Sequence, residues 1–282
     1  MRSFLRTSLP GAMASALALA LAACNSGTDG TGPGADRPVG LGFQIARTSS
    51  ASAPAAAGVS ADGSPFTGDA PVVTPTLAGL QITRDTDVIL VTKAQLVVKD
   101  VKLKTLTASC LDDDDADDDD GCAEMHLGPI LVNVPVTGLD GARVTVDVPS
   151  GTYTSVRLSL HKVTSNDGAD ALFRQTHPDF RDISVRLEGT FNGTPFIFVN
   201  DVNAKIEVPL ESPLVVGAGG DDVTVLIDLS SWFLRPQGGL YAPSLANTPG
   251  SVRAAVQNNI RAAFRAFRDH DRDGHRDGRR GQ

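Results

Sequence analysis

Two cysteines, Cys110 and Cys122, flank the densest run of ionisable groups in the chain, a run of eight aspartates. These carboxylates match the formal net charge of −8 of the whole 282-residue chain. Such a run is either a solvated charged segment, or a loose collector of Ca²⁺ or docking patch for a basic partner. A dedicated calcium loop is not expected, because with Gly121 at the sixth position the first ligand position falls on Ala116. The aspartates are Asp112, Asp113, Asp114, Asp115, Asp117, Asp118, Asp119 and Asp120.

A second group of carboxylates, at residues 269–277, has the spacing of a calcium loop. Alternate aspartates direct their oxygens to one ion, and Gly274 permits the sharp turn. The pattern resembles the calcium loops of EF-hands, dockerins and thrombospondin-type repeats. Arg280 stands at the twelfth position instead of a bidentate Glu, so we expect weak binding, about 10⁻⁴–10⁻³ M. The resemblance implies that Asp269, Asp271, Asp273, His275 and Asp277 bind Ca²⁺, and the alternative is a solvated, disordered tail.

The third cysteine, Cys24, follows an apolar segment at the N-terminus. Arg2 and Arg6 precede this segment, which is too short to span a bilayer and is typical of a signal peptide. Its end, Leu21-Ala22-Ala23-Cys24, resembles the lipobox of bacterial lipoproteins. The resemblance implies cleavage before Cys24, acylation of its sulfur and of the new N-terminus, and stable membrane anchoring by several acyl chains. The alternative is an ordinary signal peptide that ends at a cysteine.

The assignment of Cys24 to the anchor leaves Cys110 and Cys122 as an even pair. The body of a lipoprotein lies in an oxidising compartment, where such a pair is expected to form a disulfide. The bond would close a loop of about a dozen residues and contribute roughly 2.5–3 kcal/mol in the chain-entropy model. Asn25 stands where many lipoproteins retained at the inner membrane have Asp, so we expect the outer membrane rather than the inner membrane.

The elements that position these groups have the pattern of antiparallel β-structure. Apolar and polar residues alternate, which is typical of strands with one buried and one polar face. The alternation slips by one residue near Asp100, which predicts a β-bulge, and Asn192-Gly193 predicts a type I′ hairpin. Such strands form two sheets packed face to face or a barrel, and the lack of a β-α-β rhythm disfavours parallel pairing. The clearest strands are predicted at 142–148, 156–160, 183–187, 206–210 and 223–229.

The segment Val148-Pro-Ser-Gly-Thr-Tyr153 joins two of these strands. Pro149 ends the first strand, Gly151 makes the turn, and Tyr153 places its ring on the core. The motif resembles the Pro-x-Gly-x-Tyr turn of extracellular β-sandwich modules, such as transthyretin-like and carboxypeptidase-regulatory-like domains. Residues 80–233 accordingly look like a bacterial lipoprotein domain of an uncharacterised family with such a sandwich. The resemblance implies a cell-surface or periplasmic module and no known catalysis.

The sequence as a whole predicts a mainly β chain, an antiparallel β-sandwich with one C-terminal amphipathic α-helix and disordered termini. Thr248 can cap this helix, and Val252, Val256 and Ile260 belong to its apolar stripe. We expect the helix to dock on the sandwich, and a partner- or membrane-binding helix is the alternative. The predicted segments are a lipoprotein signal peptide (1–23), a flexible tether (24–38), a first strand (39–47), a disordered loop (48–75), the sandwich (76–235), the helix (248–268) and a charged tail (269–282).

Composition and motifs restrict the classes of function that the protein can have. Asp and Glu number 33 against 25 Lys and Arg, which argues against binding of nucleic acid. The sequence has no local motif for zinc, phosphate or nucleophilic catalysis, and His161, the histidine nearest a predicted strand, is expected on a polar face. We therefore expect a non-enzymatic, lipid-anchored cell-envelope protein that binds a protein or glycan or acts as a scaffold. The alternatives are a Ca²⁺-dependent adhesion or glycan-binding module and, second, an envelope hydrolase whose catalytic residues meet only in the fold.

Overall fold

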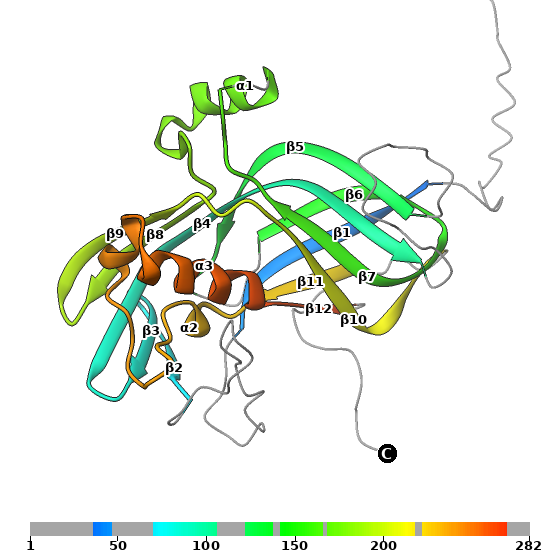
Figure 1. Cartoon of the computed structure of the whole chain (residues 1–282). Coiled ribbons are helices and arrows are strands. Elements are labelled where there is room, and N and C mark those ends of the chain that lie inside the picture. The colour runs from blue at the N-terminus through cyan, green and yellow to red at the C-terminus, as the bar shows by residue number, and fades with distance from the viewer. Residues whose placement is uncertain are drawn as a thin grey trace, which may run out of the picture. The chain divides into compact units, whose positions relative to one another are not determined.

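The structure is a computed structural model that describes residues 36–46, 70–105, 122–137, 142–165, 168–217 and 222–269. For residues 36–38, 122–127, 143 and 146 it describes the backbone alone. This part of the chain is mainly β, as predicted, and its strands join one sheet (Figure 1). The strands are β1 (Asp36–Ile45), β2 (Val72–Thr76), β3 (Gly79–Arg84), β4 (Asp87–Thr105), β5 (Cys122–Val134), β6 (Ala142–Pro149), β7 (Gly151–Leu160), β8 (Val185–Phe191), β9 (Thr194–Asn200), β10 (Ala204–Val216), β11 (Asp222–Ile227) and β12 (Phe264–Asp269).

The longest strand, β4, is the axis of the sheet. Its first half pairs with β3 and β8, and its second half pairs with β5 and β7. From β4 the order continues through β7, β10, β12, β11 and β1 to β6. Because β6 also contacts β5, this part of the sheet curves round on itself, as Figure 1 shows.

The C-terminal helix is shorter than predicted. Residues 248–268 were expected to be helical, but α3 ends at Ala262 and Phe264–Asp269 form β12. Phe264 and Phe267 have helical spacing, but β12 lies between β10 and β11, so both of its faces are covered. Ala266 and Phe267, on opposite faces, are 1% and 5% exposed. The helices are α1 (Gly168–Thr176), α2 (Leu229–Trp232) and α3 (Ser251–Ala262), with 3-10 helices η1 (Pro178–Phe180) and η2 (Pro243–Asn247).

Most neighbouring strands are antiparallel, as predicted, but two pairs, β1–β11 and β10–β12, are parallel. Parallel pairing was disfavoured because the sequence has no β-α-β repeat. Parallel neighbours need a long connection. Here several intervening strands and helices form that connection, in place of a single crossover helix. The chain leaves β10 and passes through β11 and α3 before it returns as β12, and β1 and β11 are separated by most of the fold.

Three local predictions are confirmed. The register of β4 against β5 shifts next to Asp100, where the bulge was predicted. Asn192 and Gly193 have φ angles of 48° and 80° and join β8 to β9 in a tight hairpin. The Tyr153 ring is buried, and its hydroxyl donates a hydrogen bond of 2.7 Å to the carbonyl of Pro149. The turn between β6 and β7 therefore has the contacts that its sequence predicted.

The folded part begins earlier than predicted at two places. Strand β1 starts at Asp36, within the range 24–38 predicted as a tether, and β2 lies partly inside the stretch 48–75 predicted as disordered. In β2, Val73 is buried and pairs with Ile82 of β3. These contacts are non-local, so the polar and Pro-rich composition around them did not reveal the strand. Of these two ranges, residues 24–35 and 48–69 lie outside the described residues.

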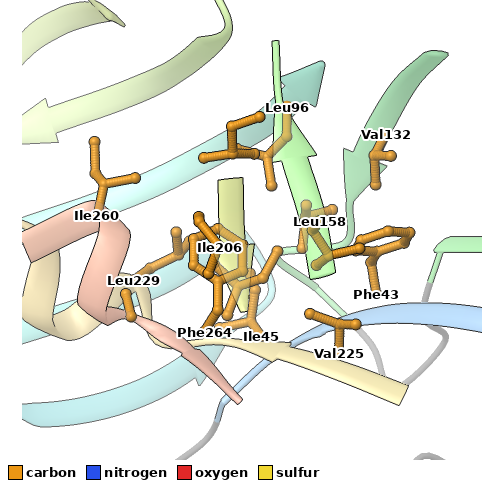
Figure 2. Packing of buried hydrophobic residues seen from close by; sticks show 14 of the residues in the cluster. Phe43, Ile45, Leu96, Val132, Leu158, Ile206, Val225, Leu229, Ile260 and Phe264 are labelled. Atoms are coloured by element: carbon orange, nitrogen blue, oxygen red, sulfur yellow. The ribbon is translucent and has the colours of Figure 1, made fainter. Parts of the chain in front are cut away.

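One large apolar cluster fills the inside of the curved sheet and reaches α2 and α3. Strand β1 contributes alternate residues to it, and Phe43 is 0% exposed. Figure 2 shows Phe43 beside Leu158 and Val225, which come from β7 and β11. A second, smaller cluster attaches α1 to the sheet and consists of Val97, Val163, Phe173 and Phe180.

Candidate functional site

The strand register brings several strand termini together at one end of the sheet, which we call the anchor end. There β1 begins beside the end of β6, β4 ends beside the start of β5, and β11 begins beside the end of β12. Strand β7 also begins there, beside the ends of β4 and β10. The pairs that mark the anchor end are Asp36–Pro149, Lys104–Cys122, Thr105–Tyr153, Val216–Gly151 and Asp222–Asp269.

Three features that the sequence singled out are attached at the anchor end. Residues 24–35 lead into β1, residues 106–121 with the eight aspartates connect β4 to β5, and residues 270–282 follow β12. They are far apart in the sequence, and the topology alone shows that they share one end of the sheet. The segments that carry the predicted lipid anchor, acidic run and calcium loop therefore join the fold at the same end of the sheet.

Two buried carboxylates lie at the anchor end, at opposed positions of β11 and β12. Asp222 is 3% exposed and Asp269 is 0% exposed. Opposed residues of an antiparallel pair share one face, with Cβ atoms roughly 4.5–5.5 Å apart. The Thr224 hydroxyl donates a hydrogen bond of 2.8 Å to Asp269, and the N–H of Gly40 donates one of 3.0 Å to Asp222. The first predicted calcium ligand, Asp269, is thus fixed in the folded part.

The carboxylate of Asp222 occupies the space that a side chain at residue 40 would need. A Cβ on Gly40 would lie 2.5 Å from Oδ2 of Asp222. Two strands that are distant in the sequence therefore fit together only because one has glycine where the other has a buried Asp. This pair could not be predicted from the sequence, since no local pattern links residues 40 and 222.

The other predicted site residues fall outside the described ranges. The disulfide stays a prediction, because only the backbone of Cys122 is described and Cys110 is not. Within the described ranges, no group of three or more His, Cys, Asp or Glu residues is arranged to hold a metal ion. The undescribed site residues are Cys24, Cys110, Asp112, Asp113, Asp114, Asp115, Asp117, Asp118, Asp119, Asp120, Asp271, Asp273, His275 and Asp277.

Close to the anchor end, Glu207 of β10 ties together three strands on the outer face of the sheet. It lies 3.3 Å from Arg157 and 3.6 Å from Lys104, and the Ser155 hydroxyl donates a hydrogen bond of 3.1 Å to it. Burial would raise the pKa of Glu207, but the hydrogen bonds from Arg157 and Ser155 and the nearby positive charges outweigh burial and lower it. The alternating pattern predicted a polar face here, but not which charges meet.

The histidine expected on a polar strand face, His161, instead follows the end of β7 and contacts a buried carboxylate. Its Nε2 lies 2.7 Å from Oδ1 of Asp170, which is 0% exposed in the first turn of α1. The N–H and the hydroxyl of Thr164 donate hydrogen bonds of 2.6 and 3.1 Å to the other oxygen of Asp170. These contacts fasten α1 to the end of β7, which is a structural role. Their partners are close in sequence, but only the fold of the connection brings them together.

A second polar network holds α3 against the connection between β9 and β10. The Asp201 carboxylate accepts hydrogen bonds from Arg253 and from Gln257, the latter at 3.1 Å, and Lys162 lies 3.4 Å away. Burial would raise the pKa of Asp201, but the hydrogen bond and charge of Arg253 and the charge of Lys162 outweigh burial and lower it. The charges of Asp201, Arg253 and Lys162 pair with one another within this network. We therefore interpret the network as structural, holding α3 in place.

The opposite end of β4 carries a surface that we call the distal tip. The β3–β4 turn and the β8–β9 turn meet there, because Ile89 of β4 pairs with Phe191 of β8. The N–H of Val88 donates a hydrogen bond of 2.8 Å to the side-chain carbonyl of Asn192. The distal tip comprises residues 85–88, 192–193 and 235–241.

Two carboxylates fasten the third segment of the distal tip to the β3–β4 turn. The N–H of Gly239 donates a hydrogen bond of 2.7 Å to Asp85, and the N–H of Leu240 donates one of 2.8 Å to Asp87. The distal tip is therefore held together by polar contacts between segments from three parts of the chain. The distal tip was not predicted from the sequence. An Asp in a turn, such as Asp85, is common for local reasons and does not indicate a contact with a distant segment.

Aromatic side chains give little support to the predicted glycan-binding alternative. Trp232 and Tyr153 are 0% and 2% exposed, so neither can stack on a sugar. Tyr241 in the distal tip is half-buried, and the guanidinium of Arg235 lies 5.9 Å from its ring centroid. An exposed platform built from Trp232 and Tyr153 is therefore ruled out.

The chain matches no protein-family model, no curated protein sequence and no solved structure. Among the helices of the described ranges, none has the length and apolar character needed to cross a membrane. The function of the protein is accordingly inferred from its residues and their arrangement.

Proposed function

We propose that the protein is a lipid-anchored protein of the cell envelope, at the outer membrane, whose β-structure serves as a non-enzymatic binding or scaffolding module. The observation that carries this proposal is the sequence Leu21-Ala22-Ala23-Cys24 at the end of an apolar segment that Arg2 and Arg6 precede. Acylation of Cys24 with several chains would hold the protein stably in a bilayer. The first strand begins twelve positions after Cys24, at Asp36.

The connection between the proposed anchor and the fold is short. Eleven residues, 25–35, separate Cys24 from Asp36. As a flexible segment they would have a root-mean-square span of roughly 17–20 Å, and fully extended they would reach at most about 40 Å. The strand that follows, β1, lies between β6 and β11. A pull from the anchor would therefore act on a strand that is hydrogen-bonded on both sides.

Metabolic labelling of the full chain with an alkyne analogue of palmitate, in a bacterium with two membranes, tests the proposal. We expect a labelled protein in the outer-membrane fraction, and accumulation of an uncleaved form when lipoprotein signal peptidase is inhibited. Cys24→Ser should abolish the label, whereas the matched control Cys110→Ser should keep it. Label that persists in Cys24→Ser, or that is absent from the unaltered chain, would contradict the proposal.

A second candidate function, Ca²⁺ binding, is favoured by the burial of Asp269 opposite Asp222. Asp269 holds the first ligand position of the predicted loop, and the hydrogen bond from Thr224 fixes its carboxylate at the end of β12. The proposed ligands are those that the resemblance to calcium loops implies, namely Asp269, Asp271, Asp273, the carbonyl of His275, and Asp277.

Calorimetric titration of the chain from Asn25 onward with CaCl₂ tests this second candidate. We expect saturable heat in the range of about 10⁻⁴–10⁻³ M, lost in Asp273→Asn and kept in the matched control Asp179→Asn. A chain that ends after Asp269 keeps β12 whole, whereas an end after Phe267 would remove two of its residues. Heat that survives the truncation after Asp269 would assign the ion to residues 112–120. Absence of saturable heat up to several millimolar would overturn the candidate function.

A further inference from the structure

The strands β2, β3, β8 and β9, with the first part of β4, have one side covered by the core and one side at the surface. On the covered side, Leu80 and Ile89 belong to the large apolar cluster. The Phe198 ring packs there against Phe233, with 5.1 Å between the ring centroids. Burial alternates along β2, β3 and β9, so the residues between the buried ones point to the other, outer side. On that outer side they are exposed or half-buried.

The strand register places rows of uncharged side chains on this outer side. All the strand pairs concerned are antiparallel, so opposed residues share one face. One row crosses all five strands and consists of Thr74, Gln81, Leu90, Thr190 and Pro195. The next row toward the distal tip consists of Val72, Thr83 and Val88. We call these two rows, together with the outward-pointing Ile197 of β9, the uncharged face.

The chain has 33 acidic and 25 basic residues, but on these strands the charges lie at the border of the uncharged face or on its far side. Toward the anchor end, Glu188 accepts hydrogen bonds of 3.1 Å from Lys93 and 2.9 Å from Arg186. The charges of this border are therefore paired with one another. Asp87 stands at the opposite border, in the distal tip, and Arg84 is buried on the inner side.

Apolar side chains are exposed at both edges of the uncharged face. Val72 of β2 is 53% exposed and Ile197 of β9 is 50% exposed, and the half-buried Val88 and Leu90 lie between them. Exposed apolar groups that gather on one face mark an interaction surface. The hydroxyls of the three Thr residues and the amide of Gln81 can each donate and accept hydrogen bonds. Such groups can bond to a second copy of the same face.

We propose that the uncharged face binds the same face of a second copy of this chain, in a weak, reversible dimer with two-fold symmetry. A two-fold interface is self-complementary, because each patch meets a copy of itself. A charged patch would bring like charges together in such an interface, which is unfavourable. The uncharged face avoids this repulsion, and two sheets can pack face to face about 10 Å apart.

The size of the uncharged face fits a weak dimer. Five strands at about 4.8 Å span roughly 19 Å, and the rows from Val72 to Ile197 extend over roughly 13 Å along the strands. With the width of the side chains, each copy would contribute roughly 400–500 Å². The total of roughly 800–1,000 Å² is below the 1,200–2,000 Å² of stable complexes. We therefore expect a dissociation constant of about 10⁻⁵–10⁻³ M.

Analytical ultracentrifugation of the chain from residue 25 onward, which contains all of the described fold, measures this association. The chain carries Cys110→Ser and Cys122→Ser, so that no disulfide can join two copies. We expect the weight-average mass to rise toward that of a dimer as the concentration increases to about 1 mM. Leu90→Glu and Leu90→Lys, at the centre of the longer row, should each raise the dissociation constant at least about tenfold, because like charges would then meet. The matched control Val215→Glu, at a 53% exposed position of β10 outside the face, should leave it unchanged.

A mixture of the two Leu90 variants should associate again, because Glu on one copy then meets Lys on the other. This recovery separates a contact through the face from a loss of folding, and the emission of the buried Trp232 shows that each variant keeps its core. Thr190→Glu and Thr190→Lys form a second pair for the same experiment if the Leu90 variants do not fold. Folded variants that stay apart in the mixture would overturn the two-fold arrangement.

Ionic strength gives an independent readout. Raising the salt concentration from about 0.15 M to about 1 M should strengthen the dimer, since salt screens the repulsion between two acidic chains. An interface of opposite charges would instead weaken. A chain that stays monomeric up to about 1 mM, or a dimer that Leu90→Glu leaves intact, would overturn the proposal. The tested chain begins after Cys24, so this result is independent of the proposed lipid anchor.

Discussion

Truncation of Phe43 should destabilise the whole fold, because the strand that follows the proposed tether is part of the central core. Phe43 is 0% exposed in β1, between β6 and β11, and Figure 2 shows it among core residues of other strands. Removal of a buried Phe side chain costs about 3–5 kcal/mol, and domains have a total stability of about 5–15 kcal/mol. We therefore expect Phe43→Ala to remove at least about a fifth of the free energy of unfolding.

Equilibrium unfolding in urea measures this loss, with the fluorescence of Trp232 as the signal. Trp232 is the single tryptophan and is 0% exposed, so its emission reports on the core. Gln44→Ala is the matched control, since residue 44 is half-buried on the opposite face of the same strand. We expect its effect to stay within about 1 kcal/mol. A difference between the two variants of less than about 1 kcal/mol would show that β1 is not integral to the fold.

Further predictions concern close packing, backbone conformation and pH. Gly40→Ala should cost about 1–3 kcal/mol in urea unfolding, because its Cβ would lie 2.5 Å from the Asp222 carboxylate; an unchanged midpoint would show that the carboxylate moves aside freely. Gly193→Ala should cost about 1–2 kcal/mol by thermal unfolding, because φ is 80° there although the surrounding space is open. The Asp201 contribution to stability should be present above its ordinary pKa of 3.8 and be lost as pH falls below that value, because Arg253 lowers its pKa in the fold against the effect of burial. Arg253→Met should flatten this acid limb of the urea midpoint below about pH 5, and an unaltered limb would assign it to other carboxylates.

Features of the fold that arise from neighbouring residues were predictable from the sequence. The Asn192-Gly193 turn needs positive φ angles, which these two residue types tolerate, and it forms as predicted. The bulge near Asp100 follows from the one-residue slip in alternation, since a strand cannot expose its core face halfway along. In each case the physical requirement lies within a few consecutive residues.

Features that depend on distant strands were not predictable in this way. The run that became β12 has Phe264 and Phe267 at helical spacing, and only its insertion between β10 and β11 makes it a strand. The contact of His161 with Asp170 and the fit of Gly40 against Asp222 likewise depend on how the chain turns back. The sequence alone predicted the lipidation site, the acidic run and the calcium loop. Only the register of the strands shows that the segments that carry them join the fold at the same end of the sheet.

Mass spectrometry of the N-terminal peptide, from the protein purified out of bacterial membranes, tests the lipid anchor at Cys24. We expect a peptide that begins at Cys24, with a diacylglyceryl group on its sulfur and an acyl chain on its amino group. A peptide that begins at another residue, or an unmodified Cys24 at the mature N-terminus, would contradict the lipid anchor.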